Sequence, residues 1–375
     1  MDITVKDGKT LLVDGPASVT LVSGKVEVFG FPMEHAYKVI IRDGKRMPFT
    51  VEETATFNIS LGENSCVEEL EGSTIPPSWS KAYEELLAVP SKPAVALVFG
   101  ASDSGKTSFC TYLLNKLLGE KRRVAILDAD LGQSDIGPPC TIAYTFVSKP
   151  VTDLFNLLVK NAFFVGVTSP SKAVDKVLQG LTLLKEEIFN NSPDFIVVNT
   201  DGWVEGEDAV QYKVQLAERI SPNIIFCIQQ NDKLNPLLAA LKNYRTFTID
   251  SPPAIKQRSR EKRKSLRELG YIKYLKNAKV QCIPLNWVKI ENFEQAGLGK
   301  NAATPTSGGK NLLVGLYDGE ERFLGIGIIR EIDYVRKIMK VFTPVINGVS
   351  TIVVGRVRLD KNFKEIPPMP IEEKR

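Results

Sequence analysis

A strand, a glycine loop and a helix follow one another in residues 94–109, AVALVFGASDSGKTSF. Gly100 and Gly105 flank four residues, and Lys106 and Thr107 come next. Glycines at this spacing let the backbone curl so that its N–H groups point at phosphate oxygens, while the lysine reaches the β and γ phosphates and the threonine hydroxyl can ligate Mg²⁺. A chance glycine-rich turn would lack the strand before it and the helix after it, whose positive N-terminal end also favours an anion. The sequence therefore predicts a P-loop for a nucleoside triphosphate, formed by Gly100, Ala101, Ser102, Asp103, Ser104, Gly105, Lys106, Thr107 and Ser108.

Length and composition indicate a globular chain with more than one domain. Its 375 residues exceed what one ordinary core holds, and 43% hydrophobic with 25% charged residues is the composition of a soluble protein. No apolar run approaches the ~20 residues of a membrane helix. The start MDITVKDGKT has no signal-peptide apolar region, so we expect a cytoplasmic protein without a membrane partner. The five cysteines are widely spaced and form no C-x-x-C pair, so we expect buried thiols rather than zinc ligands or disulfides.

Two regions of the chain have the alternating pattern of short strands. Residues 1–80 predict an N-terminal β domain, and residues 277–375 predict a C-terminal β-rich domain. Asp43-Gly44, Asp318-Gly319 and Asn347-Gly348 are two-residue signals for hairpins.

Between them, residues 81–276 alternate apolar strands with amphipathic helices. Strands are expected at 94–99, 124–130, 163–167, 195–200 and 223–228, and helices at 171–189 and 207–220 among others. This pattern predicts a parallel sheet covered on both faces, with ligands at the carboxyl ends of its strands. The predicted fold class is therefore α/β: a P-loop kinase domain with a parallel sheet, flanked by N-terminal and C-terminal small β domains.

The basic residues gather in one short segment. Residues 251–280 hold ten Lys or Arg and two Glu, a net +8, so the rest of this +4 chain sums to −4. A helix through KQRSREKRKSLRELGYIKYL would place Lys256, Arg260, Arg263 and Arg267 on one face. Such a face could contact nucleic-acid phosphates or neutralise a phosphoryl group in transfer. A solvated helix face is the open alternative.

Polar clusters follow two strands of the predicted parallel sheet. Asp128 and Asp130 end the second strand, where one carboxylate can support Mg²⁺ while the other accepts a proton from an attacking hydroxyl. A strand end with one structural Asp is the alternative. The fourth strand runs into TDGW, where the indole of Trp203 could stack on a nucleobase or pack in the core.

Four motifs in this order, GASDSGKT, DADLGQ, TDGW and the arginines Arg258, Arg263 and Arg267, resemble those of the RNA-processing polynucleotide 5′-hydroxyl kinases. This P-loop family includes the kinase subunit of the pre-mRNA cleavage complex, the nucleolar rRNA-processing kinase and stand-alone archaeal enzymes. Asp103 in the P-loop, the VTSP sequence at 167–170 and the β, kinase, β order also fit, so the resemblance covers essentially the whole chain. The short C-terminal domain is more similar to archaeal members, which implies that protein partners are not required.

The resemblance implies a role for each matching residue. Lys106 would act on the triphosphate of ATP and Thr107 on Mg²⁺, with Asp128 near the metal and Asp130 as the base that activates the RNA 5′ hydroxyl. Arg263 and Arg267 would belong to a lid segment, 255–270, that closes over the phosphates. Thr200 and Trp203 would grip the terminal nucleotide, and Gln133 and Arg258 would also bind the substrate.

These features predict an ATP- and Mg²⁺-dependent kinase that transfers the γ-phosphate of ATP to the 5′-OH end of RNA, with DNA ends as a second candidate substrate. An ATP-bound scaffold of an RNA-processing complex is the alternative, and the pair of carboxylates argues against it. A nucleotide switch acting on proteins leaves the TDGW loop and the basic helix unexplained. IQQND in place of N-K-x-D after the fifth strand argues against GTP. The preference between RNA and DNA stays open.

Overall fold

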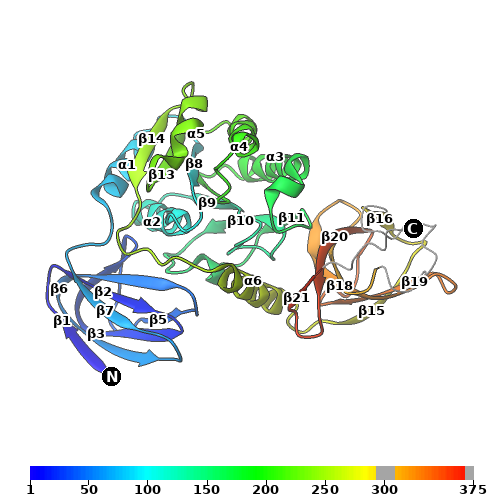
Figure 1. Cartoon of the computed structure of the whole chain (residues 1–375), viewed down its shortest axis with the longest axis horizontal. Helices are drawn as coiled ribbons and strands as arrows, with labels where there is room; N and C mark the ends of the chain where they lie inside the picture. Colours follow the sequence, from blue (N-terminus) through cyan, green and yellow to red (C-terminus); the bar gives the residue numbers. More distant parts are fainter. Residues whose placement is uncertain (293–308, 368–375) are drawn as a thin grey trace. The chain divides into compact units, whose positions relative to one another are not determined.

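Three sheets follow one another along the chain in the computed structural model, which describes residues 1–292 and 309–367 (Figure 1). The first sheet is antiparallel, the second is flanked by helices, and the third is mainly antiparallel, so the predicted order of β, α/β and β regions is confirmed. The domain boundaries at 80/81 and 276/277 stay predictions, and residues 293–308 and 368–375 of the predicted C-terminal domain lie outside the described residues. Packing divides the chain into two units, one of residues 1–129, 144–158 and 181–262 and one of residues 130–143, 159–180 and 263–375.

The N-terminal sheet of the first unit consists of β1 (Asp2–Val5), β2 (Lys9–Asp14), β3 (Ala17–Val28), β4 (Phe31–Pro32), β5 (Lys38–Ile41), β6 (Arg46–Leu61) and β7 (Val67–Glu71). Its order is β4-β3-β6-β2-β7, with β1 paired to β6 and β5 paired to β3. The Asp43-Gly44 turn closes between β5 and β6, where the N–H of Lys45 donates to the carbonyl of Arg42 (3.1 Å). Both flanking strands pair with β3, so the predicted hairpin is wrong: the dipeptide reverses the chain but does not choose the partner strand.

The α/β part of the first unit contains parallel strands β8 (Ala94–Gly100), β9 (Val124–Ala129), β12 (Phe195–Thr200), β13 (Ile224–Gln229) and β14 (Thr246–Asp250). They lie in the order β9-β12-β8-β13-β14, and each neighbouring pair is parallel. Every residue of β8 is buried, as expected for a strand covered on both faces. Two strands are not among those predicted: β10 (Thr141–Val147) and β14, whose TFTID sequence is short and mostly accessible to solvent.

The second unit contains β11 (Asn161–Phe164) and a sheet of β15 (Lys279–Pro284), β16 (Lys289–Glu291), β17 (Leu312–Tyr317), β18 (Phe323–Asp333), β19 (Ile338–Thr343), β20 (Thr351–Leu359) and β21 (Glu365–Ile366). The sheet order is β15-β19-β18-β17-β20-β16, with β21 on β20. The Asp318-Gly319 hairpin is confirmed, since β17 and β18 pair antiparallel. The Asn347-Gly348 hairpin is wrong, because β19 pairs with β18 and β20 pairs with β17. Phe164 and Tyr271 lie in the core under this sheet.

The helices are α1 (Pro77–Leu87), α2 (Lys106–Gly119), α3 (Val174–Asn190), α4 (Glu207–Ile220), α5 (Asn235–Ala240) and α6 (Arg260–Tyr274), with 3₁₀ turns at Leu154–Asn156, Pro170–Lys172 and Asp232–Leu234. Helix α4 has the predicted bounds. Helix α6 begins at Arg260, so Lys256 precedes it and the prediction that Lys256 shares a helical face with the arginines is wrong. Among the described helices, none has the length and apolar character needed to cross a membrane.

The cysteines are only partly as predicted. Cys110, Cys140 and Cys227 are buried, whereas Cys66 and Cys282 are exposed. Cys282 lies on β15, the edge strand of its sheet, where most side chains are accessible, so the expectation of five buried thiols is wrong.

Candidate active site

The predicted P-loop connects β8 to α2 in a tight turn. A β carbon on Gly100 would lie 2.5 Å from the Oγ of Ser104 and 3.2 Å from the carbonyl oxygen of Ile228, so no larger residue fits there. Gly105 caps α2 with a φ of 99°, in the left-handed region that favours glycine. The two glycines thus have the close approach and the backbone freedom that the spacing predicts.

Polar groups inside this loop are arranged as a phosphate site requires. The Nζ of Lys106, which is only 7% exposed, donates to the carbonyl oxygens of Gly100 (2.9 Å) and Ala101 (2.7 Å). The Oγ of Ser104 is buried, and no described residue offers it a hydrogen-bond partner. A buried hydroxyl without a partner is costly unless a ligand satisfies it. Together with the N–H groups at the start of α2, these groups fit the phosphates of a nucleotide.

The segment after β14 contacts the backbone of the P-loop. The Oγ of Ser251 donates to the carbonyl oxygen of Ser104 (3.0 Å). Gln230, the residue after β13, adds a second contact, since its Nε2 donates to the carbonyl oxygen of Asp103 (3.2 Å). Pro252 lies 2.9 Å from the position that a β carbon on Gly105 would take. These contacts fix the loop backbone without using the groups that face its interior.

Asp103 anchors the same segment through Arg258. Its carboxylate accepts from the backbone N–H of Arg258 (3.0 Å) and from the guanidinium Nη1 (3.2 Å), and its side chain is only 4% exposed. The Nε of Arg258 also donates to the carbonyl oxygen of Gly44 (2.9 Å). Arg258, predicted to bind substrate, is therefore a support of the P-loop in this structure.

The two predicted carboxylates have different surroundings. Asp128, at the end of β9, is fully buried, and its Oδ1 accepts from the Nδ2 of Asn199 (3.0 Å), its register partner on β12. Asp130 is partly exposed, and its Oδ1 accepts from the backbone N–H groups of Gly132 (3.1 Å) and Gln133 (3.0 Å). A carboxylate held by two N–H groups keeps a fixed orientation while part of it stays accessible. The Nε2 of Gln133 donates in turn to the carbonyl oxygen of Arg263 (2.9 Å), which brings these two predicted residues together.

The TDGW loop lies against the P-loop. A β carbon on Gly202 would lie 2.4 Å from the Oγ and 2.5 Å from the backbone N of Ser102. Trp203 is half-buried, and its ring stacks on Tyr212 at 5.6 Å between centroids and 23° between planes. Thr200 is fully buried, and its hydroxyl donates to the carbonyl oxygen of Val98 (2.7 Å). Its side chain therefore holds the loop onto β8 instead of facing a ligand.

Comparisons with known proteins match the region that contains these motifs. Residues 100–277 match the model of the mRNA cleavage and polyadenylation factor CLP1 P-loop. The chain is 29% identical over 322 residues to a polyribonucleotide 5′-hydroxyl-kinase of Pyrococcus abyssi, covering 73% of this chain and 90% of that one. A similar kinase of Methanocaldococcus jannaschii is 29% identical over 325 residues, with 73% and 90% covered. The chain is thus similar to the Clp1/Grc3 polyribonucleotide 5′-hydroxyl kinases, through its P-loop region and over most of its length.

A solved structure shares the fold of this chain. A wild-type Clp1p–Pcf11p complex superimposes with a TM-score of 0.76 at 15% identity, over 96% of this chain and 97% of that one. At this identity the likeness concerns the fold, which includes the α/β P-loop domain between two β regions.

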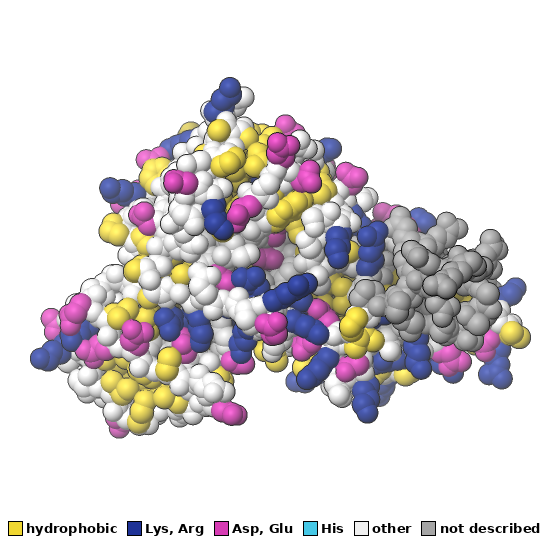
Figure 2. Space-filling model, viewed as in Figure 1, with side chains coloured by type: hydrophobic (Ala, Val, Ile, Leu, Met, Phe, Trp, Pro, Cys, Tyr) yellow, Lys and Arg dark blue, Asp and Glu magenta, His cyan; other side chains and the backbone are white. Residues whose placement is uncertain are grey.

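Arg263 and Arg267, the two arginines predicted for the lid, lie on α6. Dark blue side chains mark the surface over this helix in Figure 2. The guanidinium of Arg267 forms a two-pronged pair with the carboxylate of Glu365 (Nε to Oε1 2.7 Å, Nη2 to Oε2 2.8 Å), and both side chains are mostly buried. The hydroxyl of Tyr271 donates to the same carboxylate (3.2 Å). Arg267 is thus held by β21 in this structure.

A buried acid ties the N-terminal sheet to the segment before α6. Asp14, at the end of β2, accepts from the Nε of Arg46 (2.8 Å), the Nζ of Lys256 (2.8 Å) and the Sγ of Cys66 (3.3 Å). Burial opposes the charge of this carboxylate, but these hydrogen bonds outweigh it and lower its pKa to about 2. Lys256, predicted to lie on the basic helix, instead precedes it and pairs with Asp14.

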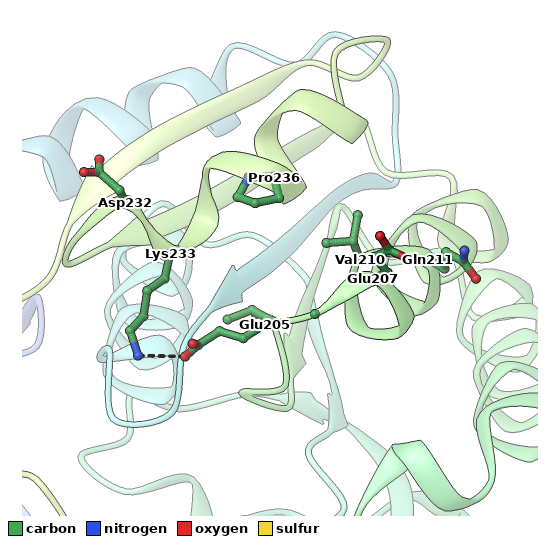
Figure 3. Close-up of a pocket in the computed structure, with 9 residues that line it drawn as sticks. Glu205, Glu207, Val210, Gln211, Asp232, Lys233 and Pro236 are labelled. Atoms are coloured by element: carbon green, nitrogen blue, oxygen red, sulfur yellow. Dashed lines mark hydrogen bonds and ion pairs between the residues drawn. The ribbon is translucent and has the colours of Figure 1, made fainter.

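A pocket beside the TDGW loop has the wrong charge for a polyanion. Figure 3 shows this pocket, of about 580 Å³, between the start of α4 and the turn before α5. Glu205, Glu207 and Asp232 line it, and its Lys233 is paired with Glu205 (2.7 Å). Because these carboxylates outnumber the single paired lysine, the pocket is not expected to take phosphates.

Several residues that contact the site were not predicted from the sequence. None of them belongs to a recognisable motif: they are Asn199, Tyr212, Lys213 and Ser251. Asn199 alone carries a signal, since an amide in the apolar strand FIVVNT has to find a buried partner.

Proposed function

We propose that this chain is an ATP-dependent polynucleotide 5′-hydroxyl kinase that phosphorylates the 5′-OH ends of RNA. The observation that carries the proposal is the contact between two loops. The P-loop suits a triphosphate, and the TDGW loop with its half-buried indole packs directly on Ser102 of that P-loop. A nucleotide end that stacks on Trp203 would therefore lie next to the triphosphate. The polyribonucleotide kinases to which the chain is similar support the same substrate.

Each residue of the site has a role in this reaction. Lys106 and the P-loop N–H groups bind the β and γ phosphates and stabilise their charge during transfer. Thr107, in the first turn of α2, and the buried Asp128 offer the oxygen ligands that suit Mg²⁺. When bound, Mg²⁺ supplies further neutralisation of phosphate charge.

Asp130 is the base of the proposed reaction. The 5′ oxygen of RNA attacks the γ phosphorus of ATP, the bond between that phosphorus and the β-phosphate oxygen breaks, and Asp130 takes the proton of the hydroxyl. Its hydrogen bonds from the backbone N–H groups of Gly132 and Gln133 fix the orientation of this carboxylate. Arg263, on the lid segment, stabilises the charge on the transferred group.

The test is transfer of label from γ-labelled ATP to a 5′-OH oligonucleotide. Lys106→Ala and Asp130→Ala are each expected to abolish transfer. Asp360→Ala is the matched control for the second, because Asp360 also accepts two backbone N–H groups, from Asn362 (2.8 Å) and Lys364 (2.9 Å). No transfer by the unaltered protein under conditions where it binds ATP would refute the enzyme and favour an ATP-bound scaffold.

Matched RNA and DNA oligonucleotides in the same assay determine the substrate. Faster transfer to RNA is expected, in line with the polyribonucleotide kinases that the chain resembles. Equal transfer to both would mean that the site makes no use of the 2′-OH.

A further inference from the structure

Two neighbouring residues of α4 lie beneath the TDGW loop, and no motif marks them. Tyr212 is 1% exposed and Lys213 is fully buried. Lysine is rarely buried completely, and a buried ammonium is retained only where it is paired and hydrogen-bonded. Its presence here requires an explanation that core packing alone does not give, since an apolar side chain of similar size would fill the same space.

Both residues converge on the carboxylate of Asp201. Its Oδ2 accepts from the hydroxyl of Tyr212 (2.9 Å) and from the Nζ of Lys213 (2.9 Å), and its Oδ1 accepts from the backbone N–H of Trp203 (2.9 Å). The Nζ of Lys213 also donates to the backbone carbonyl of Asp201 (3.0 Å). The main chain on both sides of Gly202 is therefore fixed by one buried ion pair.

The same ion pair connects this loop to the strand that carries the P-loop. The Nζ of Lys213 lies 5.0 Å from the centre of the Tyr212 ring and 5.3 Å from that of Phe99, the residue before Gly100. A cation within about 6 Å of two aromatic ring centres is attracted by both rings. Lys213 thus interacts both with Phe99, on the strand that carries the P-loop, and with Asp201 of the TDGW loop.

The indole of Trp203 lies on the ring of Tyr212 in an offset stack. One part of the indole is covered by tyrosine, and the part that remains accessible is what a ligand can reach. We propose that Tyr212 and the buried Asp201–Lys213 pair hold Trp203 as a rigid platform on which the terminal base of the polynucleotide stacks, with Lys213 as a positioning residue. This inference rests on the proposed polynucleotide substrate. Because every base has a π face, such a platform accepts any of the four bases at the 5′ end.

The test is equilibrium binding of a labelled 5′-OH oligoribonucleotide in the absence of ATP. Trp203→Ala and Tyr212→Leu are each expected to weaken binding by about 5- to 150-fold, the range that corresponds to one base–aromatic stack. Tyr212→Phe keeps the ring and loses only the hydroxyl, so it is expected to bind within about threefold of the unaltered protein, as rescue by the conservative variant requires.

Lys213→Met tests the positioning role. It is expected to weaken oligonucleotide binding while ATP binding, measured separately, changes by less than about threefold, since the groups that face the P-loop interior are untouched. If this variant does not fold, the Tyr212 pair of variants carries the test. Tyr83→Leu on α1 is the control for removing a buried aromatic ring elsewhere in the same unit, and is expected to bind like the unaltered protein.

Two outcomes separate this inference from the proposed function. A folded Tyr212→Leu protein that binds the oligonucleotide as tightly as the unaltered protein would overturn the platform, even if the protein is an active kinase. An unaltered protein that binds the oligonucleotide in a Trp203-dependent way but transfers no phosphate would refute the kinase and leave the platform supported. Binding that varies more than tenfold among the four 5′ bases would also contradict the platform.

Discussion

Replacing Gly202 by alanine separates the two loops of the site by a distance that the structure defines. The added β carbon would lie 2.4 Å from the Oγ, 2.5 Å from the backbone N and 2.7 Å from the Cα of Ser102. Two of these three atoms belong to the P-loop backbone, so rotation of a side chain cannot relieve the contact. The TDGW loop, the P-loop or both have to move.

The size of that movement sets the expected loss of activity. Non-bonded carbon atoms prefer a separation of about 3.5–4.0 Å, so the loops have to part by about 1 Å. A misplacement of about 1 Å between reacting groups costs roughly 10²-fold in rate, or about 2.7 kcal/mol of barrier. Overpacking of this kind costs about 1–3 kcal/mol of stability, which a typical domain tolerates. Gly202→Ala is therefore expected to fold and to transfer phosphate about a hundredfold more slowly.

Single-turnover transfer from γ-labelled ATP to a saturating 5′-OH oligonucleotide measures this loss directly. Gly119→Ala is the matched control, because a β carbon on this residue at the end of α2 meets nothing within 4 Å. A folded Gly202→Ala protein that transfers phosphate within threefold of the unaltered protein would refute the argument that contact between the loops sets the geometry of transfer.

Three further predictions concern groups outside the reacting centre. Asp14 has a folded-state pKa of about 2, below its ordinary value, so its contribution to stability is complete at pH 5 and above and is lost as the pH falls toward 2. The difference in unfolding free energy between the unaltered protein and Asp14→Asn is expected to shrink over that range in urea titrations, and a constant difference would contradict this. Glu365→Ala removes the carboxylate that holds Arg267 and is expected to cost about 1.5–3 kcal/mol of stability, so a loss below about 0.5 kcal/mol would contradict the pairing. Of the five thiols, only the exposed Cys66 and Cys282 are expected to react rapidly with Ellman's reagent in the native protein, Cys282 first, because the hydrogen bond to Asp14 raises the pKa of the Cys66 thiol.

Features that depend on neighbouring residues could be predicted from the sequence. The P-loop is one, since a strand, two glycines and a helix start are read from consecutive residues, and α4 is another, with bounds that match at both ends. The turn dipeptides show that strand pairing cannot be predicted from neighbouring residues alone. Asp318-Gly319 joins paired strands, but the strands around Asn347-Gly348 pair elsewhere, because the choice of partner depends on side chains far along the chain.

The same limit applies to the site residues. Thr200 and Trp203 stand in one motif, yet the first is buried on β8 and the second is half-buried, because the side chains of a strand and of the loop after it point in different directions. The partner of Arg258 is Asp103, 155 residues away, so its place behind the P-loop cannot be read from the basic segment in which it lies. An excess of positive charge predicts contacts with negative groups but does not distinguish a carboxylate of the protein from a phosphate of a ligand.

Three groups of the N-terminal sheet and its turns bind the basic segment that precedes and begins α6. Asp14 holds Lys256, the carbonyl of Gly44 holds Arg258, and Asp43 pairs with Lys262. The segment that carries these three cations also binds Asp103 of the P-loop, so each contact with the sheet limits how far the loop can move. Three ion pairs or charged hydrogen bonds within seven residues are more than the linker between independent domains needs. The N-terminal sheet is therefore part of the support of the P-loop, and three of the four cations in residues 256–262 are paired with groups of the protein itself.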